Sequence, residues 1–449
     1  MKLYSRFLSL LLAVLVLFSA SALGETALRQ PDDAGISQYD YDNDPRTDAY
    51  ADYIVQYGLN VQKGDYVVIQ APVLAWPLVN IAAKKCYAAG AASVNVLYND
   101  PAFTATTIAS LSDNQYSNFS FSDMLATAAV GLMGNTLQAL VILSPTPSVQ
   151  PVDSQTQQAY ASAGQESIKR LLSIQPDTKR SAPDRWCAVA YPNVDWARKV
   201  YPEYSDEEAL SALWEDIYAY LYMTPEAPTT DVLVQHTAEL DKRAEQLTKM
   251  NIRALHFTNS QTDLTVGLHQ SNIFQSPTST TSTVNSLPNI PCEECFGMPE
   301  KHSVNGYVAT SRPLVLDNGT IINNMRLTFK DGQVTEWSAD TGMDALNALM
   351  EKENARYLGE VSIVSTKTPL FESGRVFYTT LLDENAACHL AFGNCYMEYN
   401  LPAGVAPDDE CNQSPIHVDF MIGTTDTTIT AILQDGTEQV IFKDGDWAF

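Results

Sequence analysis

The chain has 449 residues, of which 27 are basic and 53 are acidic, and its formal net charge is −26. This length suits two domains better than one small core, and the hydrophobic content of 45% is that of a globular protein. Because a field of this sign repels polyanions, the composition argues against a nucleic-acid or anionic-membrane partner.

The N-terminus has the layout of a secretory signal. Two basic residues precede an apolar run over residues 7–18, and small residues follow over 19–24. This order predicts a signal peptide over residues 1–24 and a protein that is secreted or held in the cell envelope. The apolar run is short for a membrane span, and an uncleaved N-terminal anchor is the alternative. Residues 25–46 are polar and predict a disordered spacer.

Residues 47–250 alternate between short apolar strands and helices. The expected strands are 65–70, 93–98, 139–143 and 187–190, and the expected helices are 50–57, 76–89, 205–222 and 229–250. A strand, a helix and a second strand in this order form a βαβ unit, which predicts a parallel sheet covered by helices. We therefore expect a Rossmann-like α/β domain over 47–250. The turn Ala71-Pro72-Val73 lacks the glycines of a phosphate-binding loop, so no nucleotide is indicated.

Strand-like segments dominate after residue 250. Asp331-Gly332 and Asp435-Gly436 are hairpin signals, and one helix is expected over about 343–357. We place a domain boundary near residue 250 and expect an α+β catalytic domain over residues 251–449.

Seven cysteines occur in the chain, and an odd number leaves at least one unpaired even where export permits disulfides. Cys292 and Cys295 form the only C-x-x-C pair of the sequence, whereas a four-cysteine structural zinc site needs two such pairs. We therefore expect no structural zinc at this pair. Most of the cysteines are expected to be buried thiols, and the sequence allows one disulfide.

The segment 416–423 interleaves apolar residues with His417 and Asp419. This alternation predicts a strand that presents both side chains on one face, where an imidazole and a carboxylate can bind the same ion. Three more potential ligands, Glu294, Glu360 and His389, occur upstream. Together the five suit two borderline divalent ions such as zinc, cobalt or manganese. A carboxylate must bridge the two ions, and Glu294 and Glu360 are the candidates.

Five segments, in this order, resemble the aminopeptidase T / aminopeptidase S family of bacterial metal-dependent exopeptidases. They are PCEECF (291–296), SVNGYV (303–308), RYLGEV (356–361), DENAACHL (383–390) and HVDFMIG (417–423). The resemblance runs from about residue 50 to the C-terminus. It implies a homodimer that acts on peptides with a free N-terminus. It also implies that the metal ligands are Glu294, Glu360, His389, His417 and Asp419.

The resemblance also singles out Tyr396, which lies seven residues after His389 and matches a tyrosine at the family's site. Its phenol would stabilise a tetrahedral intermediate by a hydrogen bond, or its ring would belong to the core. Glu293 and Glu384 are each interpreted either as the general base or as a carboxylate that orients a histidine. With Glu360, these residues are the candidate catalytic set.

The other histidines carry less information. His236 and His256 have no motif partner and are expected to be structural. The segment Glu300-Lys301-His302 exchanges the acid and the histidine relative to the family pattern, which leaves the substrate preference open.

The sequence thus predicts an exported metallo-aminopeptidase that releases N-terminal residues from peptides by two-metal hydrolysis. The alternative from a different class is a secreted, non-catalytic peptide- or metal-binding protein on the same scaffold. Such a protein is expected to have lost one or more ligands, whereas all five are present here. A related hydrolase such as an amidase is a third hypothesis, which the sequence does not separate from the first.

Overall fold

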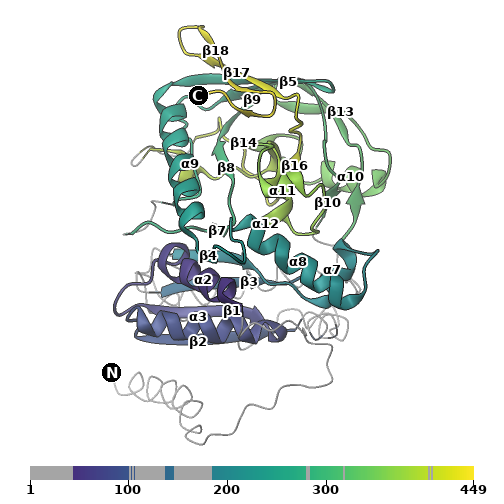
Figure 1. Cartoon of the computed structure of the whole chain (residues 1–449). Helices are drawn as coiled ribbons and strands as arrows, with labels where there is room; N and C mark the ends of the chain where they lie inside the picture. Colours follow the sequence, from purple (N-terminus) through teal and green to yellow (C-terminus); the bar gives the residue numbers. More distant parts are fainter. Residues whose placement is uncertain are drawn as a thin grey trace, which may run out of the picture. The chain divides into compact units, whose positions relative to one another are not determined.

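The computed structural model of the protein describes residues 44–100, 103, 106, 137–145, 185–279, 284–316, 319–402, 405 and 408–449 (Figure 1). All of them belong to one structural unit, Ser37–Phe449. The predicted signal peptide and most of the predicted spacer lie outside the described residues. None of the helices in the described part of the chain is both long and apolar enough to cross a membrane.

Four strands from before residue 250 and one from after it form a five-stranded sheet in the order β2-β1-β3-β4-β7, in which every neighbouring pair is parallel. Its strands are β1 (Tyr66–Pro72), β2 (Ser93–Asn99), β3 (Leu137–Leu143), β4 (Arg185–Ala190) and β7 (Asn289–Ile290). Helix α3 (Trp76–Ala88) connects β1 to the parallel β2, so this βαβ unit is present as predicted. The Rossmann-like classification stays a prediction, because 107–136 and 146–184 lie outside the described residues.

The described residues before 250 also form the helices α2 (Pro45–Tyr53), α7 (Val194–Val200), α8 (Asp206–Tyr220) and α9 (Asp231–Lys249), and a π-helical turn, Ile54–Gly58, extends α2. A capping box begins α8: the Ser205 side chain accepts a hydrogen bond from the Glu208 N–H, and the Glu208 carboxylate accepts one from the Ser205 N–H. Helix α8 ends two residues before the predicted position, and Tyr222 then adopts the left-handed conformation with φ 57°.

The second half contains an antiparallel eight-stranded sheet in the order β13-β12-β9-β6-β5-β17-β18-β19. Its strands are β5 (Ile252–Asn259), β6 (Thr262–Leu268), β9 (Pro299–Ala309), β12 (Arg326–Lys330), β13 (Gln333–Ser338), β17 (Thr428–Leu433), β18 (Glu438–Lys443) and β19 (Asp446–Trp447). Both predicted hairpins are present. Asp331 and Gly332, with φ 49° and 84°, form the two-residue turn between β12 and β13.

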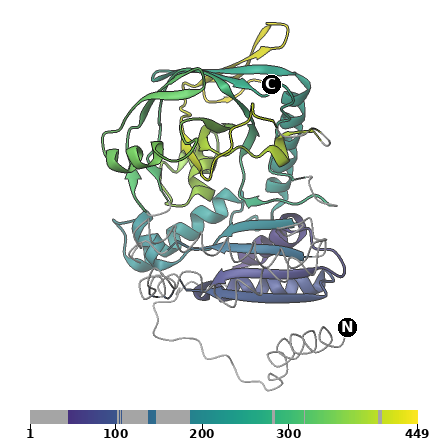
Figure 2. The same cartoon turned by 180° about the vertical axis from the view of Figure 1, so that it is seen from behind.

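A smaller antiparallel sheet, in the order β16-β15-β14-β8, packs against the eight-stranded one (Figure 2). Its strands are β8 (Glu294–Gly297), β14 (Leu358–Val364), β15 (His389–Gly393) and β16 (His417–Met421). Val361, Leu390 and Phe420 of this sheet share a buried core with Leu255 and Val304 of the larger sheet. The smaller sheet therefore has one face anchored in a core.

Short elements connect and flank these sheets. They are β10 (Leu314–Val315), β11 (Ile321–Ile322), α10 (Met343–Met350), α11 (Pro369–Glu372), α12 (Thr380–Asp383), a 3-10 turn (Glu384–Ala386) and α13 (Met397–Asn400). Helix α10 is shorter than the predicted helix over 343–357. The Arg356 side chain donates to the Met350 carbonyl at 3.0 Å, and Asn354 is left-handed with φ 55°, so the chain turns back after Met350.

The described residues form two large buried cores. One surrounds the parallel sheet, and the other lies between the two antiparallel sheets. Helix α9 contributes Leu233 to the first core and Leu240 and Leu247 to the second. Strand β7 also crosses the predicted domain boundary, because it follows residue 250 in the sequence and yet pairs with β4 in the parallel sheet. The domain boundary near residue 250 stays a prediction.

Candidate metal centre

All five predicted ligands lie on the four-stranded sheet, and each strand supplies at least one. Glu294 is the first residue of β8, Glu360 lies in β14, His389 begins β15, and His417 and Asp419 lie in β16. The register brings them together, because Ser362 pairs with His389, and Ala391 pairs with both Glu360 and Asp419. The predicted strand over His417 and Asp419 is confirmed.

The five side chains form two groups that share Glu360. In the first group, His389 Nε2 lies 3.0 Å from Glu294 Oε2 and 3.4 Å from Glu360 Oε1. In the second, His417 Nε2 lies 3.6 Å from Glu360 Oε2 and 3.2 Å from Asp419 Oδ1. Glu360 thus directs one carboxylate oxygen toward each histidine, which is the arrangement that a bridging ligand needs.

The backbone sets both histidines in the tautomer that a metal ligand requires. His389 Nδ1 lies 3.1 Å from the Ala387 carbonyl oxygen, and His417 Nδ1 lies 2.8 Å from that of Asn394. A carbonyl can only accept, so each Nδ1 carries a proton and donates a hydrogen bond, which leaves Nε2 as the nitrogen that can bind an ion once it has lost its proton.

His389 Nε2 supports this assignment. The atom is buried and faces two carboxylates, with Glu294 Oε2 at 3.0 Å and Glu360 Oε1 at 3.4 Å, but neither contact has the geometry of a good hydrogen bond. An unpartnered buried nitrogen beside two carboxylates fits a divalent ion as its missing partner.

The centre concentrates negative charge in a buried place. Burial raises the pKa of Glu360, and the neighbouring Glu294 and Asp419 carboxylates raise it further. Burial alone would lower the pKa of His417, but Asp419 and Glu360 outweigh that effect and raise it to about 9. Without an ion, protons therefore compensate the charge of the carboxylates. A divalent cation can replace those protons.

The structure places Glu384 and Tyr396 beside this centre. Burial raises the pKa of Glu384 well above its usual value, and the charges of Asp419 and Glu294 act in the same direction. The Tyr396 ring lies 4.5 Å from the His417 ring, measured between centroids. Burial raises the pKa of Tyr396, and the carboxylate of Glu360 contributes. Both groups are therefore protonated neighbours of the carboxylates in the ion-free protein.

Glu293 has other partners. Its carboxylate accepts from the Tyr222 hydroxyl at 3.0 Å and lies 2.5 Å from His236 Nε2. Its peptide N–H donates to Asn385 Oδ1 at 2.7 Å. The histidine that Glu293 contacts is therefore His236, which does not belong to either ligand group. The sequence singled out neither Tyr222 nor this role of His236, because the contacts join distant parts of the chain.

Cys292 and Cys295 point to different partners. Cys292 Sγ lies 3.7 Å from Glu294 Oε1, whereas Cys295 Sγ donates to the Leu240 carbonyl at 3.4 Å. The two thiols of the C-x-x-C pair therefore do not converge on one point.

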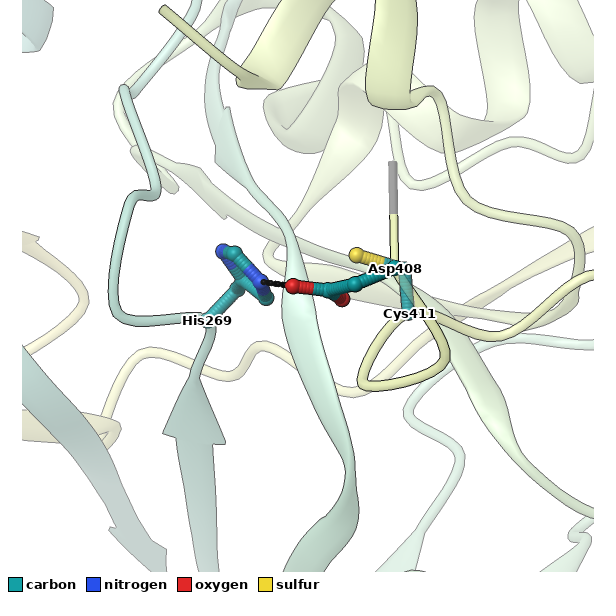
Figure 3. Close-up of side chains that lie close together, drawn as sticks. All are labelled: His269, Asp408 and Cys411. Carbon is teal, nitrogen blue, oxygen red and sulfur yellow. Dashed lines mark hydrogen bonds and ion pairs between the residues drawn. The ribbon is translucent and has the colours of Figure 1, made fainter. Parts of the chain in front are cut away.

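A third group of potential ligands, His269, Asp408 and Cys411, shares no residue with the centre just described (Figure 3). His269 Nε2 is 3.1 Å from Asp408 Oδ2, and His269 Nδ1 accepts from the Ser271 N–H at 3.1 Å. Because Nδ1 is the acceptor, Nε2 carries the proton and donates it to Asp408. This tautomer is the opposite of the one found at His389 and His417. His269 therefore has no lone pair facing the group.

Comparisons with known proteins agree with the geometry. The model of the thermophilic metalloprotease family (M29) matches residues 43–447. Aminopeptidase 2 of Geobacillus stearothermophilus is 35% identical over 415 residues, which cover 90% of this chain and 97% of that protein. Aminopeptidase AmpS of Bacillus subtilis is 32% identical over 90% of this chain and 98% of its own length.

Among solved structures, that of wild-type AmpT from Thermus thermophilus is similar with a TM-score of 0.79 and 30% identity. It covers 90% of this chain and 99% of AmpT. The match supports the mixed α/β architecture, and the family implies the use of a divalent metal. The chain therefore belongs to the thermophilic metalloprotease family M29 and is a metallo-aminopeptidase.

Proposed function

We propose that the protein is an exported aminopeptidase that hydrolyses peptides at a centre of two divalent ions. Glu294 and His389 would hold one ion, His417 and Asp419 would hold the other, and Glu360 would be the ligand shared by both groups. The observation that carries the proposal is the position of Glu360, with one oxygen toward each histidine. Zinc, cobalt and manganese suit these nitrogen and carboxylate ligands.

Bound divalent ions supply a Lewis acid and an activated water. The side chains of the chain do the rest. Glu384, buried among the ligands, receives the proton of the attacking water and passes it to the leaving amine. The Tyr396 hydroxyl donates a hydrogen bond to the oxygen on which negative charge develops. Each role requires a group beside the ligands, and both residues lie there.

A small hollow at the edge of the centre marks the side from which we propose that substrate approaches. Its lining combines apolar and acidic side chains with one threonine: Leu314, Val315, Thr380, Asp383, Glu384, Asp419 and Met421. We infer that the N-terminal residue of a peptide lies here, with its free amine beside the ligand carboxylates. An N-acetylated peptide lacks the charge that these acids attract and is expected to resist hydrolysis.

The deciding experiment combines a substrate panel with metal analysis. Aminoacyl-amides and their N-acetylated counterparts are incubated with the full chain, with and without a chelator, and bound metal is counted by mass spectrometry. We expect two ions per chain, turnover of the free amines alone, and loss of turnover in chelator. Equal turnover of blocked and free substrates, or full activity in chelator, would refute the proposal. Metal binding without turnover of any substrate would favour the non-catalytic alternative.

Export and assembly are separate proposals. Export rests on the charged, apolar and small-residue order of residues 1–24. N-terminal sequencing of protein recovered from the medium is expected to find a chain that begins between about residues 20 and 25. A chain that begins at Met1 in the cytoplasm would contradict export. The homodimer rests on the family resemblance, and sedimentation of the purified protein tests it.

A further inference from the structure

A small buried cluster beside the metal centre contains two thiols that the proposed reaction does not use. Cys395 and Cys411 are 1% and 2% exposed, and they pack with Met298 and Leu401. The Cys395 N–H donates to the carbonyl of Asn412, the neighbour of Cys411, at 2.9 Å, so the two cysteine-bearing segments run side by side. Both cysteines are free thiols in this structure, and the neighbouring Cys395 thiol raises the pKa of the Cys411 thiol.

Other buried cysteines contact the main chain or a carboxylate. Cys388 Sγ donates to the Val364 carbonyl at 3.3 Å, and Cys295 Sγ donates to the Leu240 carbonyl at 3.4 Å. Cys292 Sγ faces the Glu294 carboxylate. Cys395 and Cys411 differ from these cysteines because the thiol of each has the thiol of the other as a neighbour. The backbone bond from the Cys395 N–H to the Asn412 carbonyl already holds their two segments together, which is the placement that a disulfide requires.

The contacts around Cys411 argue against its being a metal ligand. Cys411 belongs to the group with His269 and Asp408 (Figure 3), but the His269 nitrogen that faces Asp408 carries a proton. That group therefore lacks the imidazole lone pair that zinc needs. Cys411 Sγ also lies 3.2 Å from Met298 Sδ, so its surroundings are rich in sulfur and apolar. Such surroundings suit a neutral disulfide better than a charged thiolate.

We propose that Cys395 and Cys411 form a disulfide, and that this bond holds Tyr396 in place beside the metal centre. In its formation two S–H bonds break and one S–S bond forms. The two electrons and two protons pass to a disulfide-bearing oxidant, which leaves as two thiols. Export would supply an oxidising compartment, but the bond itself can form with any such oxidant.

The position of the bond explains its effect on the centre. Cys395 lies between Asn394, whose carbonyl accepts from His417 Nδ1, and Tyr396, whose ring lies 4.5 Å from the His417 ring. Cys411 lies shortly before β16, the strand that carries His417. A disulfide therefore fixes the segment that orients His417 to the segment that leads into its strand. The bond acts on Tyr396 and His417 through their backbone, and it does not touch the substrate.

Thiol counting on the full-length protein is the first test. The purified protein is incubated with oxidised glutathione, denatured, and labelled with an alkylating reagent before or after reduction. We expect five labelled cysteines before reduction and all seven of the sequence after it. Peptide mass spectrometry should find the peptide with Cys395 joined to the peptide with Cys411. Seven labelled cysteines after oxidation, or a different pair, would overturn the proposal. So would protection of both thiols by zinc that a chelator reverses.

A second test measures what the bond does. The oxidised protein should melt roughly 5 °C above the protein reduced with tris(2-carboxyethyl)phosphine, and its kcat should fall several-fold on reduction. Cys395→Ser and Cys411→Ser should show neither redox difference. The matched control is Cys86→Ser, in the distant helix α3, which should keep both. A disulfide without any effect on kcat would refute its role in holding Tyr396, and thiol counting on the wild type is unaffected by any folding defect of the variants.

Discussion

Glu360 connects the two ligand groups, and so it is the residue whose loss should disturb both. Its two oxygens face different histidines. Two divalent ions bring four positive charges, three carboxylates offset three of them, and a hydroxide brings the site to neutrality. Glu360→Gln removes one negative charge and one strong ligand. We expect loss of hydrolysis by at least 100-fold with the fold retained.

Metal content and kcat of Glu360→Gln are the measurements, with circular dichroism as the check on folding. His389→Ala should behave in the same way, because one ion then lacks its nitrogen ligand. The control is Glu336→Gln, an exposed glutamate on β13 that should keep full activity. Wild-type metal content and kcat in Glu360→Gln would show that the bridging assignment is wrong.

The proposed role of Tyr396 depends on its hydroxyl group alone and can be tested by removing that group. If its phenol stabilises the developing oxyanion, Tyr396→Phe should lower kcat by about 100-fold and change KM little. Tyr399→Phe is the matched control, because Tyr399 lies in the short helix α13 that Tyr396 caps, with its ring centroid 6.1 Å from that of Tyr396. Steady-state kinetics on a free aminoacyl-amide distinguish the two. An equal loss in both variants would point to packing.

His417 predicts a pH dependence of metal binding. Its pKa in the ion-free protein is raised to about 9, so the ring is protonated at pH 7.5 and must lose that proton to bind an ion. Calorimetric titration of the chelated protein, in two buffers of different ionisation enthalpy, should show release of at least one proton per chain at pH 7.5. The release should decline above pH 9. Metal binding without proton release at pH 7.5 would contradict the assignment.

The raised pKa of His417 also makes the folding stability of the ion-free protein depend on pH. Because the folded-state pKa of His417 lies above its unfolded value of about 6.5, protonation stabilises the ion-free protein fully below that value. The contribution is lost as the pH rises through about 9. The ion-free protein should therefore lose this increment at alkaline pH, where an ion would take the place of the proton.

At the scale of elements, the capping box of α8 allows a clean comparison. The Ser205 side chain accepts a hydrogen bond from the Glu208 N–H, whereas Thr230 at the start of α9 makes no such side-chain bond. Ser205→Ala should therefore lower the free energy of unfolding by about 1 kcal/mol, and Thr230→Ala should change it by much less. Denaturant unfolding measures both. Equal losses would mean that the capping bond contributes nothing measurable.

Elements whose signals are local were predictable from the sequence. The Asp331-Gly332 turn and the Ser205 capping box each depend on residues a few positions apart. The end of α10 was not predictable in this way, because it depends on the Arg356 side chain, six positions after Met350, which donates a hydrogen bond to the Met350 carbonyl. The five proposed ligands were identified through their motifs. Their grouping around Glu360 and the carbonyls that set the two tautomers are tertiary contacts, which no local pattern records.

Glu293 shows the same limit within the site. The sequence placed it next to a ligand, but its partners Tyr222 and His236 are 71 and 57 positions away. Adjacent residues near the start of a strand point to opposite sides. Proximity in sequence to Glu294 was therefore a poor guide to what the Glu293 carboxylate contacts.

For the whole molecule, the metal centre should contribute to stability as well as to catalysis. Ions bind the folded chain, since the ligands come from four strands that are separate in the unfolded one. A free ion concentration about 1,000-fold above Kd adds about 4 kcal/mol. Removal of metal should thus lower Tm by several degrees in calorimetry. Glu360→Gln should show a smaller drop, and an unchanged Tm in the wild type would contradict the proposed ligand set.

The separation of these strands along the chain also determines when the protein can acquire its metal. Glu294 and Asp419 belong to the first and last strands of the sheet to be synthesised. No complete set of ligands exists until nearly the whole chain has been made and folded. A chain that is exported before it folds would therefore take its ions from the exterior. Since ligands of this kind accept several divalent ions, the supply outside the cell would then decide which one the enzyme carries.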